Sequence, residues 1–398
     1  MSNGLSRRKV LVRASGLAAG LIGMSGLLAA CSAAPSAAPT VPPATAPKPA
    51  ATQAPATAAP APTRPPAAAN APATSAPAKP TTAPAAPQTA ATLKVQVGVQ
   101  NVEFAGMFEA DQQGYLKAEN LSQQLLATGP NVAPVTVVSG GGADLGVLGG
   151  ADSLIKARSS GIPVKAFAVL LQKAPSGLLS LMSNPIKTPK DAVGKRIGLQ
   201  TGARGPWSTI LQLNGLDESQ MTIVPVEFDP SPLVNGQVDG FWSYAFNQPL
   251  ALQAQGLQIV MMVAYDAGYK YYGDVIFATD QVLKDQEDSL VRWLRGTVKG
   301  WEYTGSHAEE SARFTVDRSP DLGLKVDQQI AQNKAQIDYV TSDLTRQKGL
   351  LWMDPATWQA GIDILDKLGQ LNSPVRVDDI QTTTLLDKAF GGKTKLLT

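Results

Sequence analysis

Residues 144–171, DLGVLGGADSLIKARSSGIPVKAFAVLL, decide the fold class. Within them, 144–148 and 164–171 are apolar runs of strand length, and 152–159 between them has the length and composition of a helix. A helix that connects two strands is the repeating unit of folds with a largely parallel sheet. This stretch therefore predicts an α/β fold.

The same alternation of strands and helices extends in both directions from this stretch. Upstream, Leu93, Val95, Val97 and Val99 alternate with polar or small residues, which is the period-two pattern of a strand. Downstream, the pattern predicts strands at 178–182, 196–199, 221–226, 257–263 and 275–278, and helices at 206–213 and 248–255. From Asp280 onward the apolar residues recur at helical spacing, so a helical C-terminal part with core aromatics is expected, carried by Val291, Leu294, Val298, Trp301, Trp358, Ile362, Leu365 and Leu368.

The N-terminal residues have the composition of an export signal. Arg7, Arg8, Lys9 and Arg13 precede an apolar run over 14–30, which is too rich in glycine for a stable membrane span. The arginine pair resembles the twin-arginine export signal, with the Sec route as the alternative. We interpret residues 1–30 as a cleaved signal peptide.

Cys31 follows Leu28, Ala29 and Ala30, and these four residues resemble the bacterial lipobox. The resemblance implies that Cys31 becomes the first residue of the mature chain and is acylated, which would anchor the protein to the extracytoplasmic side of the cell membrane. The alternative is an ordinary buried cysteine. Because Cys31 is the only cysteine, the sequence excludes an internal disulfide framework and a cysteine-based zinc site.

The segment 31–92 is expected to be a disordered tether. After Cys31 it consists almost entirely of Ala, Pro, Thr and Ser, with 16 of the 30 prolines and no acidic residue. Such a segment buries too little apolar surface to offset chain entropy, and its prolines favour extended conformations. A stalk with a binding partner of its own is the alternative.

The remaining residues, 93–398, form a domain long enough for two lobes with sizeable cores. The seven basic residues of 1–92 leave 27 Lys and Arg against 32 Asp and Glu, so this domain lacks the positive excess that nucleic-acid binding requires. His307 is the only histidine and lies in a polar stretch, which excludes a His-paired nucleophile and a His-rich metal site. We therefore predict no catalytic residues, no metal, no cofactor and no nucleic-acid partner.

Several short motifs of 93–398 carry a family resemblance. They are Glu103-Phe104-Ala105-Gly106, Gln113-Gly114-Tyr115-Leu116, 142–146, 161–163, 186–191, 194–197, Gly236 with Val238 and Asp239, and Asp354-Pro355 with Trp358. In this order and spacing they resemble the periplasmic ligand-binding proteins of ABC importers, in the NMT1/THI5-like branch that also contains thiamine-pyrimidine and sulfonate binders.

The resemblance implies a two-lobed, type II-like periplasmic-binding-protein fold with a ligand cleft between its lobes. Lobe 1 would span about 93–183 and 275–398, and lobe 2 about 184–274. Closure of the two lobes around the ligand would signal its presence to an ABC permease subunit.

The loops that follow the predicted strands are expected to face this cleft. They are 100–104, 150–153, 201–207 and 242–247, joined by a tyrosine cluster near the crossover. The candidate ligand-binding residues are Asn101, Phe104, Asp152, Thr201, Arg204, Trp207, Trp242, Tyr244, Asn247, Tyr269, Tyr271 and Tyr272. Each aromatic residue has the core as its alternative, Asp152 a helix N-cap, and Arg204 an exposed loop position.

Large aromatic faces suit a flat ring by stacking, and Arg204 suits carbonyl or phosphate oxygens. Within the resemblance, these features favour a flat nitrogen heterocycle, with riboflavin as the leading ligand. A thiamine-pyrimidine precursor, a sulfonate, or a surface sensor or enzyme with the same fold are the alternatives. The iron motif and the Gly-Glu-Phe-Gly phosphate loop of the related pyrimidine synthases are missing, and 202–207 stands in place of that loop.

Overall fold

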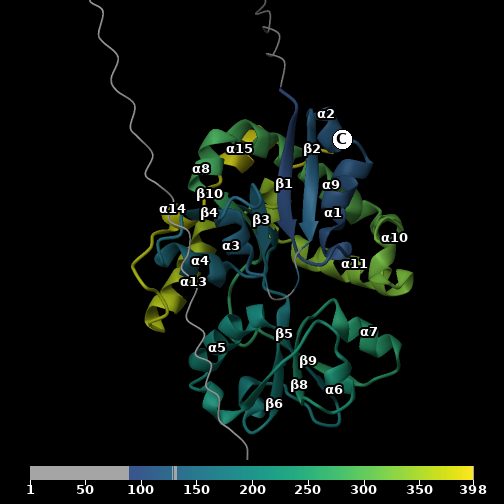
Figure 1. Ribbon diagram of the computed structural model, residues 1–398, viewed down its shortest axis with the longest axis vertical. Helices are drawn as coiled ribbons and strands as arrows, with labels where there is room; N and C mark the ends of the chain where they lie inside the picture. Colours follow the sequence, from purple (N-terminus) through teal and green to yellow (C-terminus); the bar gives the residue numbers. More distant parts are fainter. Residues whose placement is uncertain (1–88, 128, 130–131, 398) are drawn as a thin grey trace, which may run out of the picture. The chain divides into compact units, whose positions relative to one another are not determined.

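The computed structural model describes residues 89–127, 129 and 132–397 (Figure 1). The predicted signal peptide, Cys31 and nearly all of the predicted tether lie outside these residues. Strand β1 (Ala91–Val97) begins two residues before the expected start at 93, because Ala91 and Thr92 pair with Leu121 and Ser122. No helix in the described part of the chain is both long enough and apolar enough to span a membrane.

The described residues form two five-stranded mixed sheets. The first sheet has the order β2-β1-β3-β10-β4, with β1 parallel to both β2 and β3 and with β10 antiparallel to β3 and β4. Besides β1, its strands are β2 (Leu121–Ala127), β3 (Leu145–Leu148), β4 (Val164–Leu171) and β10 (Gly273–Thr279).

The second sheet has the order β7-β6-β8-β5-β9. Its strands are β5 (Ser176–Leu181), β6 (Arg196–Leu199), β7 (Thr222–Pro225), β8 (Gly240–Tyr244) and β9 (Ile259–Val263). In this sheet β6 is parallel to β7 and β8, whereas β5 is antiparallel to β8 and β9.

The chain changes sheet at 172–175, earlier than the lobe boundary expected near 183. Strand β5 pairs with β8 and β9 and so belongs to the second sheet. Gly177 permits the close pairing with β9, because a Cβ atom there would come 1.9 Å from the carbonyl oxygen of Met262. The chain returns to the first sheet between β9 and β10. The apolar run of β5 does not indicate which sheet it joins, since it is buried on both faces.

Helices accompany both sheets, as an α/β fold requires. With the first sheet are α1 (Ala105–Gln112), α2 (Tyr115–Ala118), α3 (Pro134–Ser139) and α4 (Ala151–Ser159), and with the second α5 (Arg204–Leu213), α6 (Ser231–Val234) and α7 (Gln248–Ala254). The C-terminal part is helical as predicted, with α8 (Asp280–Asp285), α9 (Glu287–Ser306), α10 (Ala308–Arg318), α11 (Val326–Val340), α12 (Asp343–Lys348), α13 (Pro355–Lys367), α14 (Val377–Ile380) and α15 (Thr384–Phe390).

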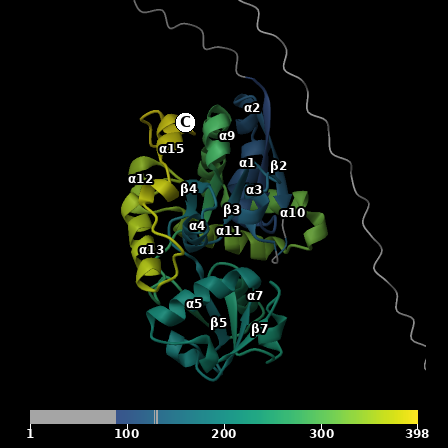
Figure 2. The same cartoon turned by 60° about the vertical axis from the view of Figure 1, so that its left-hand side comes forward.

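Most of the C-terminal helices pack with the first sheet. Helices α1 and α9 lie side by side, α13 packs on α4, and α15 packs on β4, so the yellow C-terminal end accompanies the first sheet in Figure 2. Trp301 and Trp358 are buried there, which confirms their prediction as core residues.

Candidate ligand-binding site

A cavity of about 490 Å3 is lined by residues of both sheets and the loops that follow them. The first sheet contributes the segments after β1 and β3, including Gly98, Gly149 and Gly150. The second sheet contributes the segments after β6 and β8, including Thr201 and Asn247. The carboxyl ends of these parallel strands meet at one place, as in other open α/β folds.

Seven of the twelve predicted residues line this cavity, namely Asn101, Phe104, Thr201, Trp242, Tyr244, Asn247 and Tyr269. Trp242 and Tyr244 lie within strand β8, although the sequence places them in a loop after a strand. Asn101 caps the short helix η1 (Val102–Phe104), because its side chain accepts a hydrogen bond of 2.8 Å from the backbone N–H of Glu103. This cap holds Glu103 and Phe104 at the cavity wall.

Three predicted aromatic residues are core residues and do not line the cavity. Trp207 is fully buried behind Trp242, with the two rings edge to face at a centroid distance of 6.4 Å. The hydroxyl of Tyr271 donates to the carbonyl of Gly361 at 3.1 Å. The hydroxyl of Tyr272 accepts from the backbone N–H of Asp354 at 2.9 Å, and its ring packs against Trp358. These three rings stabilise the packing around the site.

Arg204, a predicted ligand contact, is not among the residues that line this cavity. Its side chain is 66% exposed and forms an ion pair with Glu218, with an N–O distance of 3.0 Å. Because α5 begins at Arg204, the first helical turn directs this side chain to the outer surface. The alternative, an exposed arginine, describes its position.

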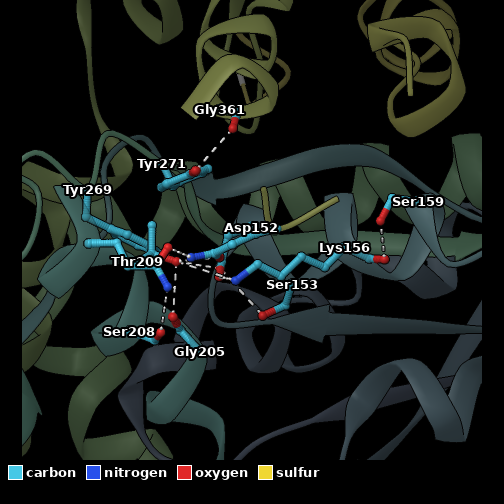
Figure 3. Close-up of polar contacts among 12 residues, drawn as sticks. Asp152, Ser153, Lys156, Ser159, Gly205, Ser208, Thr209, Tyr269, Tyr271 and Gly361 are labelled. Atoms are coloured by element: carbon cyan, nitrogen blue, oxygen red, sulfur yellow. Dashed lines mark hydrogen bonds and ion pairs between the residues drawn. The ribbon is translucent and has the colours of Figure 1, made fainter. Parts of the chain in front are cut away.

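Asp152 is neither a cavity residue nor a helix cap. Gly150 is the N-cap of α4, and Asp152 lies in the first turn of the helix, fully buried. One of its oxygens accepts a hydrogen bond from the hydroxyl of Tyr269, and the other lies 3.4 Å from the ammonium nitrogen of Lys156 (Figure 3). Asp152 therefore supports the cavity indirectly, by fixing the ring of Tyr269.

Lys156 also connects the two parts of the fold. Its ammonium nitrogen lies 3.4 Å from the hydroxyl oxygen of Thr209 on α5, and that hydroxyl in turn is 3.0 Å from the side-chain oxygen of Gln370 (Figure 3 shows the lysine and threonine). The polar network behind Tyr269 thus reaches from α4 to α5.

Two carboxyl groups on the cavity wall are missing from the predicted set. Asp274, at the start of β10, is 1% exposed, and Glu103 is partly buried. Burial raises the pKa of Asp274 from 3.8 to about 7, although a hydrogen bond from Tyr244 at 3.3 Å opposes this rise. Burial, and then the nearby Asp274, raise the pKa of Glu103 well above its usual value. An acidic residue at the start of an otherwise apolar strand is the sequence signal that could have identified Asp274.

Neutral polar side chains complete the wall. Gln200 donates to the carbonyl of Trp242 at 3.2 Å, and the Ser243 hydroxyl donates to the side-chain oxygen of Gln248 at 2.7 Å. Among the described residues that line the cavity, none is a lysine, arginine or histidine. The site therefore combines aromatic faces with neutral and acidic polar groups.

The chain is similar in sequence to two known binding proteins. The chain is 24% identical over 331 residues to the riboflavin-binding protein RibY of Chloroflexus aurantiacus, covering 76% of this chain and 91% of that protein. It is 20% identical over 279 residues to the formylaminopyrimidine-binding protein of Halalkalibacterium halodurans, covering 69% and 84%.

Among solved structures, the chain resembles the alkanesulfonate-binding protein SsuA of Xanthomonas axonopodis pv. citri. The TM-score is 0.57 and the identity 16%, over 75% of this chain and all of that one, so this likeness concerns the fold alone. The two-sheet architecture is thus the predicted periplasmic-binding-protein fold. The sequence profile of the NMT1/THI5 like family matches residues 101–311, more than half of the chain, and the protein belongs to this family.

Proposed function

We propose that this protein is the extracytoplasmic substrate-binding lipoprotein of an ABC importer and that its ligand is a flat nitrogen heterocycle, with riboflavin as the leading candidate. The aromatic cavity between the two sheets carries the proposal. Lobe 1 holds the first sheet and the C-terminal helices, and lobe 2 holds the second sheet. A permease subunit is the expected partner, and acylated Cys31 is the expected membrane anchor.

The walls of the cavity support a flat ring. Phe104, Trp242, Tyr244 and Tyr269 bring four aromatic side chains to one cavity, and Phe228 adds a fifth ring that is 44% exposed. A cavity of about 490 Å3 lies within the usual range for small-molecule sites. Stacking on such rings contributes roughly 1–3 kcal/mol per ring, by analogy with nucleobases stacked on aromatic residues.

The second support comes from the relatives. RibY and the formylaminopyrimidine-binding protein are both named as binders of nitrogen heterocycles, and both match over two thirds or more of this chain. The acidic and neutral lining favours such ligands over an alkylsulfonate, because no lysine, arginine or histidine stands among the described lining residues to pair with an anion.

Calorimetry with riboflavin, 4-amino-5-hydroxymethyl-2-methylpyrimidine and ethanesulfonate tests the proposal. We expect micromolar or tighter binding of one heterocycle and none of the sulfonate. If riboflavin is the ligand, stacking will also quench its fluorescence during the titration, and Trp242→Ala will weaken its binding about tenfold or more. Binding of the sulfonate alone would overturn the heterocycle and leave the role as a solute-binding protein in place.

A further inference from the structure

Asp152 and Asp274 are both buried carboxyl groups near the cavity, but their oxygens are used differently. Both oxygens of Asp152 have protein partners, Tyr269 and Lys156. Asp274 has one such partner: its Oδ1 accepts from the Tyr244 hydroxyl at 3.3 Å, whereas its Oδ2 is buried without a hydrogen-bond partner among the described residues. An unpartnered buried carboxyl oxygen costs free energy unless something else binds to it.

Asp274 is one of the residues that line the cavity, so a ligand bound there would lie next to its carboxyl group. It lines the cavity together with Glu103 and Tyr244, which come from three separate elements: β10, η1 and β8. Its backbone is in the left-handed region, with φ of 46°, which is uncommon for a residue other than glycine and is found more often at functional sites.

We propose that Asp274 and Glu103 form the polar recognition site of the cavity, which accepts a nitrogen-bearing hydrogen-bond donor of an uncharged or cationic ligand and excludes anions. This assignment rests on the proposed binding function and adds the chemistry that selects the ligand. The free oxygen of Asp274 accepts the N–H. Glu103 places a second carboxyl group against the same part of the cavity.

The raised pKa values fit this role. Burial raises the pKa of both carboxyl groups, and that of Asp274 to about 7, so Asp274 is partly protonated near neutral pH. A protonated carboxyl group donates and an ionised one accepts, so the pair offers both functions to one edge of a ligand. Imides and aminopyrimidines present a donor beside an acceptor, which is the complementary arrangement. An anion, by contrast, would lie against ionisable carboxyl groups with no basic lining residue to balance it.

Methylated ligands test the assignment without changing the protein. Riboflavin carries its imide donor at N3, and 3-methylriboflavin lacks it; 4-amino-5-hydroxymethyl-2-methylpyrimidine and its 4-dimethylamino analogue form a second matched pair. We expect the wild-type protein to bind the parent of at least one pair, to bind its methylated form at least tenfold more weakly, and to reject ethanesulfonate.

Variants then locate the effect. Asp274→Asn and Glu103→Gln should each weaken binding of the parent ligand about tenfold or more. Glu227→Gln should not change it, because this exposed carboxyl group lies beside the cavity residue Phe228 but does not line the cavity. Circular dichroism and thermal melts verify that each variant is folded, and the methylated ligands give the answer even if Asp274→Asn does not fold.

The outcomes separate this inference from the proposed function. If parent and methylated ligands bind equally, or if both carboxyl variants bind like the wild type, the recognition site is wrong and the binding function stands. If ethanesulfonate alone binds, the protein is a solute receptor of another kind and the recognition site is wrong. If none of the ligands binds, the heterocycle proposal fails and the recognition site fails with it.

Discussion

Asp274 links the stability of the fold to pH because its carboxyl group is buried. Its pKa in the folded chain, about 7, lies above the usual 3.8, so between these values the native protein holds a proton that the unfolded chain releases. The free energy of unfolding therefore falls as the pH rises from about 4 to about 7, and it stays at the lower level above that range. Glu103 changes it in the same direction, since burial also raises its pKa.

Asp274→Asn removes this titration and should flatten the pH dependence. The quantity to compare is the melting temperature of the variant minus that of the wild type. We expect this difference to be roughly 4–8 °C larger at pH 8 than at pH 5. Thermal melts of the unliganded proteins at both pH values measure this difference, with Glu227→Gln as the control for loss of an exposed carboxyl group. Parallel curves for variant and wild type would show that Asp274 is ionised throughout this range.

Tyr269 contributes to stability through its hydroxyl as well as through its ring. That hydroxyl donates to Oδ1 of the fully buried Asp152, and Tyr269→Phe would leave this oxygen with only the Ser153 hydroxyl at 3.5 Å. We expect the free energy of unfolding to fall by about 1–3 kcal/mol, the usual cost of an unsatisfied buried acceptor. Urea denaturation measures this difference in the free energy of unfolding. Tyr265→Phe is the matched control: it also removes one tyrosine hydroxyl, and it keeps the ring over which the Lys270 ammonium group lies. A loss no larger than in the control would mean that Asp152 finds another partner.

At the scale of helices, α1 and α9 approach closely through two glycines. A Cβ atom at Gly300 would come 2.0 Å from the backbone oxygen of Gly106, which cannot move without displacing α1. Gly300→Ala should therefore lower the free energy of unfolding by about 1–3 kcal/mol or more. Gly305→Ala on the same helix meets nothing within 4 Å and should be neutral or stabilising by up to about 1 kcal/mol. Equal effects of the two substitutions in urea denaturation would contradict this packing.

The strands and helices could be predicted where apolar periodicity is strong. The strands 164–171 and 196–199 have the predicted bounds, and the ends of the remaining predicted strands differ by two residues at most. Strand β2 has no such pattern, because Gln123 and Gln124 interrupt its apolar residues; it forms through parallel pairing with β1, which no local pattern reveals. Sheet membership of β5 likewise depends on its partners β8 and β9.

The site could be predicted only to the level of loops. In open α/β sheets, ligands bind at the carboxyl ends of the parallel strands. This rule correctly places Asn101, Phe104 and Thr201, which follow such strand ends, at the cavity. It cannot tell which side chain of a segment points inward, and so it includes Trp207, which packs on the sheet behind Trp242. It also misses Asp274, because β10 is antiparallel to its neighbours and brings its first residues, not its last, to the cavity.

For the whole molecule, we expect the binding fold and the segment that precedes β1 to have separate tasks. Cys31 precedes β1 by 60 residues in the sequence, so we expect its acylation to leave the cavity and the cap of η1 unchanged. Anchoring and ligand binding are therefore expected to respond to different substitutions, which makes the anchor testable in the intact protein.

Cys31→Ala should release the protein from the membrane without changing ligand binding. Each buried CH2 group of an acyl chain contributes about 0.8 kcal/mol to membrane affinity, so stable anchoring needs the acylated cysteine and more than one chain. We expect wild-type protein in the membrane fraction after a high-salt wash, with a mature mass that includes acyl groups. The variant should appear in the soluble extracytoplasmic fraction or as an unprocessed precursor of higher mass. Ser36→Ala, within the same segment, is the control and should stay anchored. A Cys31→Ala protein that remains in the washed membranes at its mature mass would exclude the lipid anchor, while riboflavin titration of the purified variant would report on the binding site independently.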